Sequence, residues 1–324
     1  MGDLSRLGRN RFVILGRAGM DLYADPPGRR VDESHRYVAA LGGSSANIGV
    51  AIVRQGGQAA LVTRVSEDAV GRFVLNELDR YGIDRRHVRP VGGEARTSLA
   101  VVETRIEDHQ SVIYRNGAAD FALTRDDVAA VDYAGFAGLI VTGTALAAEP
   151  SRGATFHALD LARAAGLPLI LDLDYRPYSW PSAAAAAEAC GRAAALCDIV
   201  VGNDLEFDLL APGRGLDAAR ALARSGVQVV IHKMGERGAV TIGQGSEFGS
   251  GIYEVAAIKP TGAGDAFLGG LVSALAQGRD LKEAVLRGSA CAAVVVSRVG
   301  CAPAMPTGAE LQSFLASHPG PTRA

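Results

Sequence analysis

The stretch "KPTGAGDAFLGGLVSAL", residues 259–275, decides how this sequence is interpreted, because small residues and one carboxylate precede an apolar helical pattern. The start of a helix presents unpaired backbone N–H groups and a partial positive charge. Glycines let a ligand approach such a backbone closely. The stretch therefore predicts an anion-binding helix start with Asp265 beside it. The alternative is an ordinary aspartate that caps a structural helix.

Around this segment, short apolar runs typical of strands alternate with longer runs of helical periodicity. Strands are expected at 11–16, 58–65, 138–143, 167–174, 198–203 and 227–233, a hairpin at 239–255, and helices at 42–56, 68–82, 151–166, 182–196, 204–210 and 216–225. Such alternation predicts an α/β fold with a doubly wound, mostly parallel sheet.

Two further stretches of alternating apolar and polar residues, 17–37 and 95–117, do not fit such a core. The second stretch contains two strand-like runs joined by a short polar segment, which is typical of a β-hairpin. We expect both stretches to form a small β-sheet lid over one edge of the core. The α/β core would then comprise residues 1–16, 38–94 and 118–324.

The composition excludes several classes of protein. The chain has 324 residues and a formal net charge of −2, so no basic surface for nucleic acid or an acidic membrane is expected. No signal peptide and no apolar run of roughly 18 residues occur, so no membrane span is expected. The four cysteines lack zinc and CxxC spacing, which predicts free thiols and a cytoplasmic location. Walker A, GxGxxG and HExxH motifs are missing, which disfavours P-loop kinases, nicotinamide dehydrogenases and metallohydrolases.

Four short motifs combine with this order of strands and helices. "GGSSAN" (42–47) opens the early helix and "TGAGD" (261–265) opens the late one. "NDLE" (203–206) and "KMGERG" (233–238) follow two of the expected strands. Together these features resemble the ribokinase-like (PfkB-type) sugar kinases over nearly the whole chain. The resemblance implies a kinase that uses ATP and Mg²⁺.

The resemblance implies a role for each residue of the late motif. Asp265 would be the general base that takes the proton from a primary hydroxyl as it attacks the γ-phosphorus. The N–H groups of Gly262, Ala263 and Gly264 would stabilise the charge that develops on the transferred group.

The resemblance also divides the other motif residues between three ligands. The sugar would be bound by Asp21, Gly42, Gly43 and Asn47. The nucleotide would be bound by Thr261, Lys233, Gly235 and Gly238. Mg²⁺ would be organised through water by Asn203 and Glu206. Taken singly, each feature has a structural alternative, such as a turn before a helix, a helix cap or a surface loop.

Within the family, "GRAGMDLY" (16–23), "VTGTAL" (141–146) and "DYRPYSW" (174–180) resemble kinases of keto acid sugars. The resemblance implies a six-carbon keto acid, foremost 5-dehydro-2-deoxy-D-gluconate, that is phosphorylated at its terminal hydroxyl. Arg115 and Arg176 would bind the carboxylate of this acid, because a guanidinium presents paired donors to it. In a chain so rich in arginine, solvated surface residues are the alternative.

Other substrates and roles stay open at this point. Within the class, the alternatives are a 2-keto-3-deoxygluconate kinase, a fructokinase or a ribokinase. Outside the class, a sugar-binding sensor without activity is possible, although the intact TGAGD motif disfavours it. The resemblance further implies a homodimer that forms through the lid.

Three residues depart from the family pattern. Ser45 stands where glycine, alanine or proline is usual, and Asp174 stands where kinases of acid sugars often have asparagine. Lys259 stands where many members carry an aspartate that belongs to a monovalent-cation site. Its ammonium would repel such a cation and could order the TGAGD loop instead. We therefore expect activity that does not depend on K⁺; the alternative is a solvated loop lysine without a role.

Overall fold

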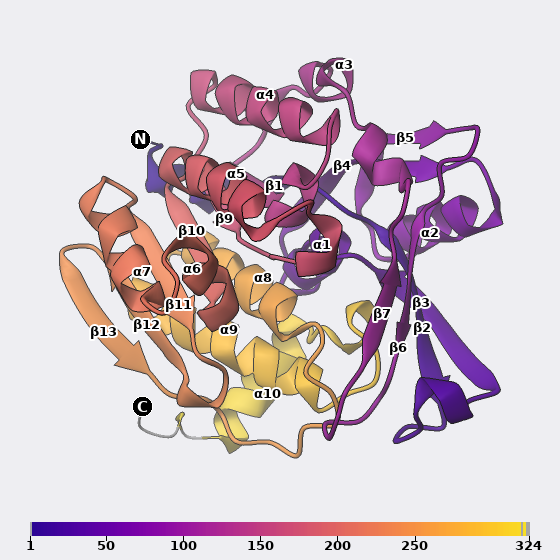
Figure 1. Ribbon diagram of the computed structural model, residues 1–324. Coiled ribbons are helices and arrows are strands. Elements are labelled where there is room, and N and C mark those ends of the chain that lie inside the picture. Colours follow the sequence, from indigo (N-terminus) through magenta and orange to yellow (C-terminus); the bar gives the residue numbers. More distant parts are fainter. Residues whose placement is uncertain (1, 319, 322–324) are drawn as a thin grey trace.

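The computed structural model describes residues 2–318, 320 and 321, which form two β-sheets with helices on both faces of the larger one (Figure 1). The strands of the large sheet, in spatial order, are β13 (Ser246–Ser250), β12 (Ala239–Gly243), β11 (Val229–Lys233), β10 (Ile199–Asn203), β9 (Leu169–Asp172), β8 (Gly138–Thr142), β1 (Arg11–Leu15), β4 (Gln58–Ser66) and β5 (Asp84–Val91). Its seven strands from β11 to β5 pair in parallel, and the β12–β13 hairpin adds an antiparallel edge.

Consecutive residues of the central strands face two separate hydrophobic cores. In β1, Phe12 and Ile14 join one core, whereas Val13 and Leu15 join the other. This alternation follows from the pleat of a strand, and a sheet buried on both faces reads as a continuous apolar run. The sheet is therefore the middle layer of a three-layer fold.

Each core is closed by its own set of helices, which Figure 1 shows on opposite sides of the sheet. The first core is covered by α1 (Ser44–Arg54), α2 (Ala69–Arg80), α8 (Ala263–Ala276), α9 (Leu281–Val296) and α10 (Gly308–Ser317). The second core is covered by α3 (Arg125–Ala129), α4 (Ser151–Ala164), α5 (Ala183–Leu196), α6 (Asp204–Leu210) and α7 (Gly215–Arg224). Within residues 2–318, 320 and 321, no helix has the length and apolar character needed to cross a bilayer.

The small sheet is the lid that the alternating segments predict. Its strand order is β3 (Arg36–Gly42), β2 (Gly19–Asp25), β6 (Ser98–Val102) and β7 (Ser111–Tyr114). β6 and β7 pair antiparallel, as expected for a hairpin. β3 runs to Gly42 and so continues past residue 37, where we placed the boundary between lid and core. The reason is that β3 leads without a loop into the turn before α1.

The expected α/β fold with a mostly parallel sheet and a β lid is confirmed. β5, α3, α9 and α10 were not expected. The polar and charged residues of β5 hide its strand pattern, because only Val88 among its eight residues is fully buried. The edge position of β5 explains this exposure.

Candidate active site

The candidate active site is a cavity of about 590 Å³ between the large sheet, the start of α8 and the lid. Asp172, Asn203 and Lys233 end the neighbouring strands β9, β10 and β11 and line this cavity. Asp21 and Ser111 line it from the lid. Ligands of open α/β sheets bind at the carboxyl ends of the strands, so the cavity has the expected place for a substrate site.

One wall of the cavity is the N-terminus of α8. Gly262 has a φ of 84°, and a Cβ there would lie 2.8 Å from Cys301 Sγ, so only glycine suits this turn. A Cβ on Gly264 would lie 3.2 Å from Lys233 Nζ, which places that ammonium beside the loop. Gly262, Ala263 and Gly264 all line the cavity. The first turn therefore offers unpaired amides and a nearby cation to an anion.

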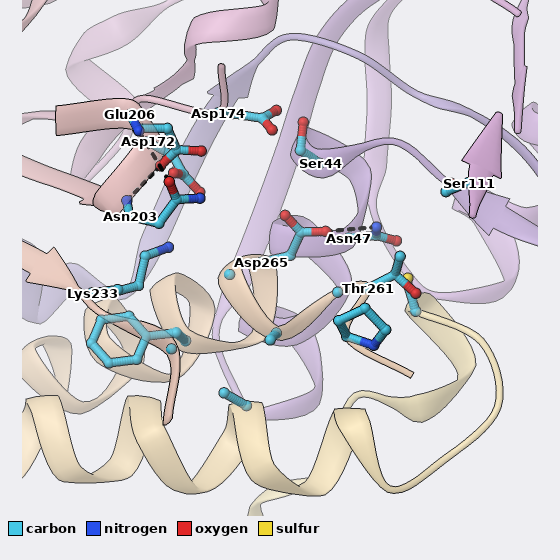
Figure 2. A pocket seen from close by; sticks show the side chains of 18 of the residues that line it. Ser44, Asn47, Ser111, Asp172, Asp174, Asn203, Glu206, Lys233, Thr261 and Asp265 are labelled. Carbon is cyan, nitrogen blue, oxygen red and sulfur yellow. Dashed lines mark hydrogen bonds between the residues drawn. The ribbon is translucent and has the colours of Figure 1, made fainter. Parts of the chain in front are cut away.

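Asp265 lies in the first turn of α8 and lines the same cavity. Burial raises the pKa of Asp265 to about 7, and the negative charge of Asp174 adds to this shift. Asn47 Nδ2 donates a hydrogen bond of 2.8 Å to Asp265 Oδ2, which opposes the shift (Figure 2). A carboxyl group whose pKa lies near neutrality is well suited to accept a proton from a hydroxyl group.

Three carboxylates gather beyond Asp265, at the ends of β9 and β10 (Figure 2). Burial raises the pKa of Asp172, which Lys233 opposes, and burial also raises the pKa of Glu206 to about 7. Asp174 has a φ of 34°, and its buried Oδ2 has no hydrogen-bond partner among the described residues. Such backbone geometry outside glycine is typical of functional sites. Mg²⁺ keeps several waters in proteins, and carboxylates around a cavity can hold it through them without ligating it directly.

Asn203 and Glu206, the expected Mg²⁺ residues, line the cavity and also cap α6. Asn203 Oδ1 accepts a hydrogen bond of 3.0 Å from the Glu206 backbone N–H, and Glu206 Oε2 accepts one of 2.7 Å from the Asn203 backbone N–H. This capping box fixes the start of the helix. It explains the NDLE spacing structurally, so a role toward Mg²⁺ remains a proposal.

The four residues expected at the nucleotide all line the cavity: Thr261, Lys233, Gly235 and Gly238. Gly238 has a φ of 81°, and a Cβ there would lie 1.9 Å from Ser250 O, so the turn into β12 requires glycine. Gly235 has a φ of 58° and open space around it. Thr261 Oγ1 is buried without a partner among the described residues.

The expected sugar residues lie at the lid end of the cavity. Asp21 is 6% exposed, and its Oδ2 accepts a hydrogen bond of 2.9 Å from Tyr23 Oη. A Cβ on Gly42 would lie 1.9 Å from Asp21 Oδ1, so Gly42 makes room for this carboxylate without lining the cavity. Gly43 and Asn47 do line it, and Gly43 has a φ of 92°.

The two arginines expected at the sugar acid differ. Arg176 lines the cavity, and its Nη2 lies 2.7 Å from Asp174 Oδ1. Arg115 does not line the cavity; its buried guanidinium pairs with Asp120 and donates to Thr144 O at 2.9 Å. The expectation that Arg115 contacts the substrate is therefore not supported, because an internal carboxylate already neutralises it.

Lys259 is fully buried, so the alternative of a solvated lysine is wrong. Its Nζ donates hydrogen bonds to Thr261 O at 2.6 Å and to Val295 O at 3.1 Å. Burial lowers the pKa of Lys259, whereas neighbouring acidic groups, Asp265 among them, raise it. The ammonium thus holds the backbone directly in front of α8.

Sequence reasoning missed Arg17, Asp172 and Tyr178, all of which line the cavity, and treated Asp174 only as a departure. Asp172 could have been found, because a polar residue at the end of an apolar parallel strand points to the ligand edge of the sheet. Arg17 and Tyr178 lie in segments without regular periodicity, and no sequence signal separates them from surface residues.

The comparisons with known proteins agree with this geometry. The model of the pfkB family carbohydrate kinases matches residues 9–308. The chain belongs to this family of carbohydrate kinases. The kinase is 41% identical to a 5-dehydro-2-deoxygluconokinase of Photobacterium profundum over 310 residues, which cover 94% of both chains. It is 35% identical to a protein of the same name from Geobacillus kaustophilus over 315 residues, 95% of this chain and 94% of that one.

Among solved structures, the kinase resembles the fructokinase of Vibrio cholerae in its fructose-, ADP- and calcium-bound form. The two chains are 28% identical and superpose with a TM-score of 0.84, over 95% of this chain and 99% of the other. The expected ribokinase-like fold and carbohydrate kinase activity are therefore confirmed.

Proposed function

We propose that this kinase transfers the γ-phosphoryl group of ATP to the terminal hydroxyl of 5-dehydro-2-deoxy-D-gluconate. The proposal rests on the relatives of that name and on one structural observation. Asp265 lies between Asn47, at the start of α1, and Lys233, at the end of β11 (Figure 2). A base between two substrates is the arrangement that direct phosphoryl transfer needs.

In this mechanism, Asp21 and Asn47 hold hydroxyl groups of the sugar so that its terminal hydroxyl faces Asp265. Asp265 accepts the proton of that hydroxyl as the oxygen attacks the γ-phosphorus. As the bond to ADP breaks, the amides of Gly262, Ala263 and Gly264 stabilise the charge on the equatorial oxygens of the transferred group.

Mg²⁺ would accompany ATP and supply positive charge to its phosphates. Asp172, Asn203 and Glu206 would hold this ion through water, and the buried, unpartnered oxygen of Asp174 offers a further acceptor. Among the described residues no cluster of three or more acidic, histidine or cysteine side chains is arranged to hold a metal. This geometry suits an ion whose main ligands are phosphates.

The lid also supports the proposal of a homodimer. Tyr37, Val38, Val112 and Tyr114 expose large apolar side chains on its strands. Such side chains are commonly covered by a partner surface, and a second copy of the lid is the proposed partner. Light scattering after size-exclusion chromatography measures the mass, and Val38→Glu should yield monomers.

The four buried free thiols agree with the proposed cytoplasmic location.

The test of the proposed function is a substrate panel. ADP release is measured with 5-dehydro-2-deoxy-D-gluconate, 2-keto-3-deoxygluconate, fructose and ribose. The proposal expects the highest kcat/KM for the first of these sugars, with the phosphate on its terminal carbon by NMR. A higher kcat/KM for fructose would make the protein a fructokinase, and no turnover with any sugar would favour a sensor.

A further inference from the structure

Arg17, in the turn between β1 and β2, is a buried cation without a carboxylate partner. Arg17 is only 7% exposed and lines the cavity. No Asp or Glu oxygen of the described residues lies within the 4.0 Å limit of an ion pair with it. The hydrogen bond that it makes joins Nη1 to Ser98 Oγ, at 3.1 Å.

The other arginines near the cavity have internal partners. Arg115 is paired with Asp120, and Arg176 is paired with Asp174. Burying a charge without a counter-charge in contact with it destabilises a folded protein strongly. A guanidinium that faces a cavity in this state therefore points to an anion that enters with the ligand.

The position of Arg17 identifies which ligand brings that anion. Its backbone carbonyl accepts a hydrogen bond of 3.4 Å from the Ala46 backbone N–H in the first turn of α1, and its side chain donates one to Ser98 at the start of β6. Both contacts lie at the sugar end, with Asp21, whereas Lys233 and Asn203 mark the nucleotide end.

Asp21 and Tyr178 act electrostatically on Arg17, although neither forms an ion pair with it. Burial raises the pKa of Asp21, and the positive charge of Arg17 opposes this shift, so the two groups are within electrostatic reach of each other. Asp21 Oδ2 already accepts a hydrogen bond from Tyr23. Burial likewise raises the pKa of Tyr178, and Arg176 and Arg17 both oppose that shift. Two guanidinium groups thus act on the same end of the cavity.

We propose that Arg17 binds the carboxylate of the sugar acid and sets the preference of the kinase for acids over neutral sugars. The inference rests on the proposed function, because it concerns the same substrate in the same site. Arg17 acts in binding and takes no part in the transfer of the proton or of the phosphoryl group. Its loss should therefore be seen mainly in KM and in the choice of substrate.

The experiment compares two substrates with two enzymes. The substrates are 5-dehydro-2-deoxy-D-gluconate and its primary amide, which has the same chain without the charge. The enzymes are the natural protein and Arg17→Gln. The substitution should lower kcat/KM for the acid at least about 30-fold more than for the amide, the effect of truncating one member of a buried charge pair. Equal losses for acid and amide would overturn the inference.

Two further variants keep the test independent of folding. Arg17→Lys retains the charge and should keep part of the preference for the acid. Arg287→Gln removes an arginine that is also 7% exposed but lies outside the cavity, and it should leave the ratio of acid to amide unchanged. Calorimetry of acid binding without ATP gives the same comparison if a variant turns over too slowly. A natural enzyme that does not use the acid would refute the proposed function, whereas an active one without Arg17–carboxylate coupling would refute only this inference.

Discussion

Asn47 donates a hydrogen bond of 2.8 Å to Asp265, across a separation of 218 residues in the sequence. This bond joins the glycine-rich start of α1 to the first turn of α8, and so joins the sugar motif to the candidate base. It fixes one carboxylate oxygen of Asp265 and leaves the other for a substrate hydroxyl. The geometry makes the role of each residue testable.

Asp265→Asn should retain the fold and nucleotide binding, because asparagine has nearly the same shape and the N-cap of α8 is Gly262 rather than Asp265. The maximal rate should fall by about two to four orders of magnitude, the usual effect of losing a general base. Steady-state kinetics measure the rate, and calorimetry measures nucleotide binding. A variant with nearly normal turnover would show that Asp265 is not the base.

The pH dependence should follow the ionisation of Asp265. Its pKa is raised to about 7, and only the ionised form accepts a proton, so kcat/KM should rise with pH, reach half of its limiting value near pH 7 and level off above it. Asn47→Ala removes the hydrogen bond that lowers this pKa, so the rising limb should move to higher pH.

Glu206→Gln serves as the control for this assignment, since Glu206 also has a pKa of about 7. The limb should keep its position in this variant even if the rate falls. If the rising limb disappears in Glu206→Gln and keeps its position in Asn47→Ala, the ionisation belongs to Glu206 and not to Asp265.

Lys259 should make the activity independent of K⁺. Its ammonium is buried and bonded to Thr261 O and Val295 O, so the loop already contains a fixed positive charge. The rate should agree within about twofold between KCl and tetramethylammonium chloride at matched ionic strength, since screening is then equal. Activation of several-fold by K⁺ would contradict this expectation. Lys259→Asp should either lose activity or acquire a requirement for K⁺.

Arg115→Ala should lower the free energy of unfolding by about 3–5 kcal/mol, because it leaves the Asp120 carboxylate buried without its partner. Urea denaturation measures this change. The double variant Arg115→Ala/Asp120→Ala should recover part of the loss, since neither charge is then left alone. A stable Arg115→Ala protein with a selective loss of acid substrate would instead support direct contact with the sugar.

The lid should close over the sugar and exclude water from the transfer. Amide hydrogen exchange in residues 17–37 and 95–117 should slow when the sugar acid binds, whereas exchange in α9 should not change. Mass spectrometry of peptides reports both regions in one experiment. Unchanged exchange in the two lid segments would remove closure from the mechanism.

The sequence predicts the sheet well, because buried parallel strands such as β8 and β10 are short apolar runs that end at polar residues. It also predicts that Asp265 lies in the first turn of a helix, because the glycines before it mark a helix start. It does not predict partners that depend on the packing of distant segments. Asp120 neutralises Arg115, whereas Arg17 forms no ion pair with any described residue, and no local pattern distinguishes these two arginines.

Tyr23 links the sugar end of the cavity to the phosphate end through hydrogen bonds. Its hydroxyl donates to Asp21 Oδ2 and accepts a hydrogen bond of 3.0 Å from the Cys301 backbone N–H. Cys301 in turn packs against Gly262, at the start of the anion-binding turn. One phenol therefore connects the lid to the phosphate end. By thermodynamic reciprocity, any gain in sugar affinity that the nucleotide causes through this connection equals the gain in nucleotide affinity that the sugar causes.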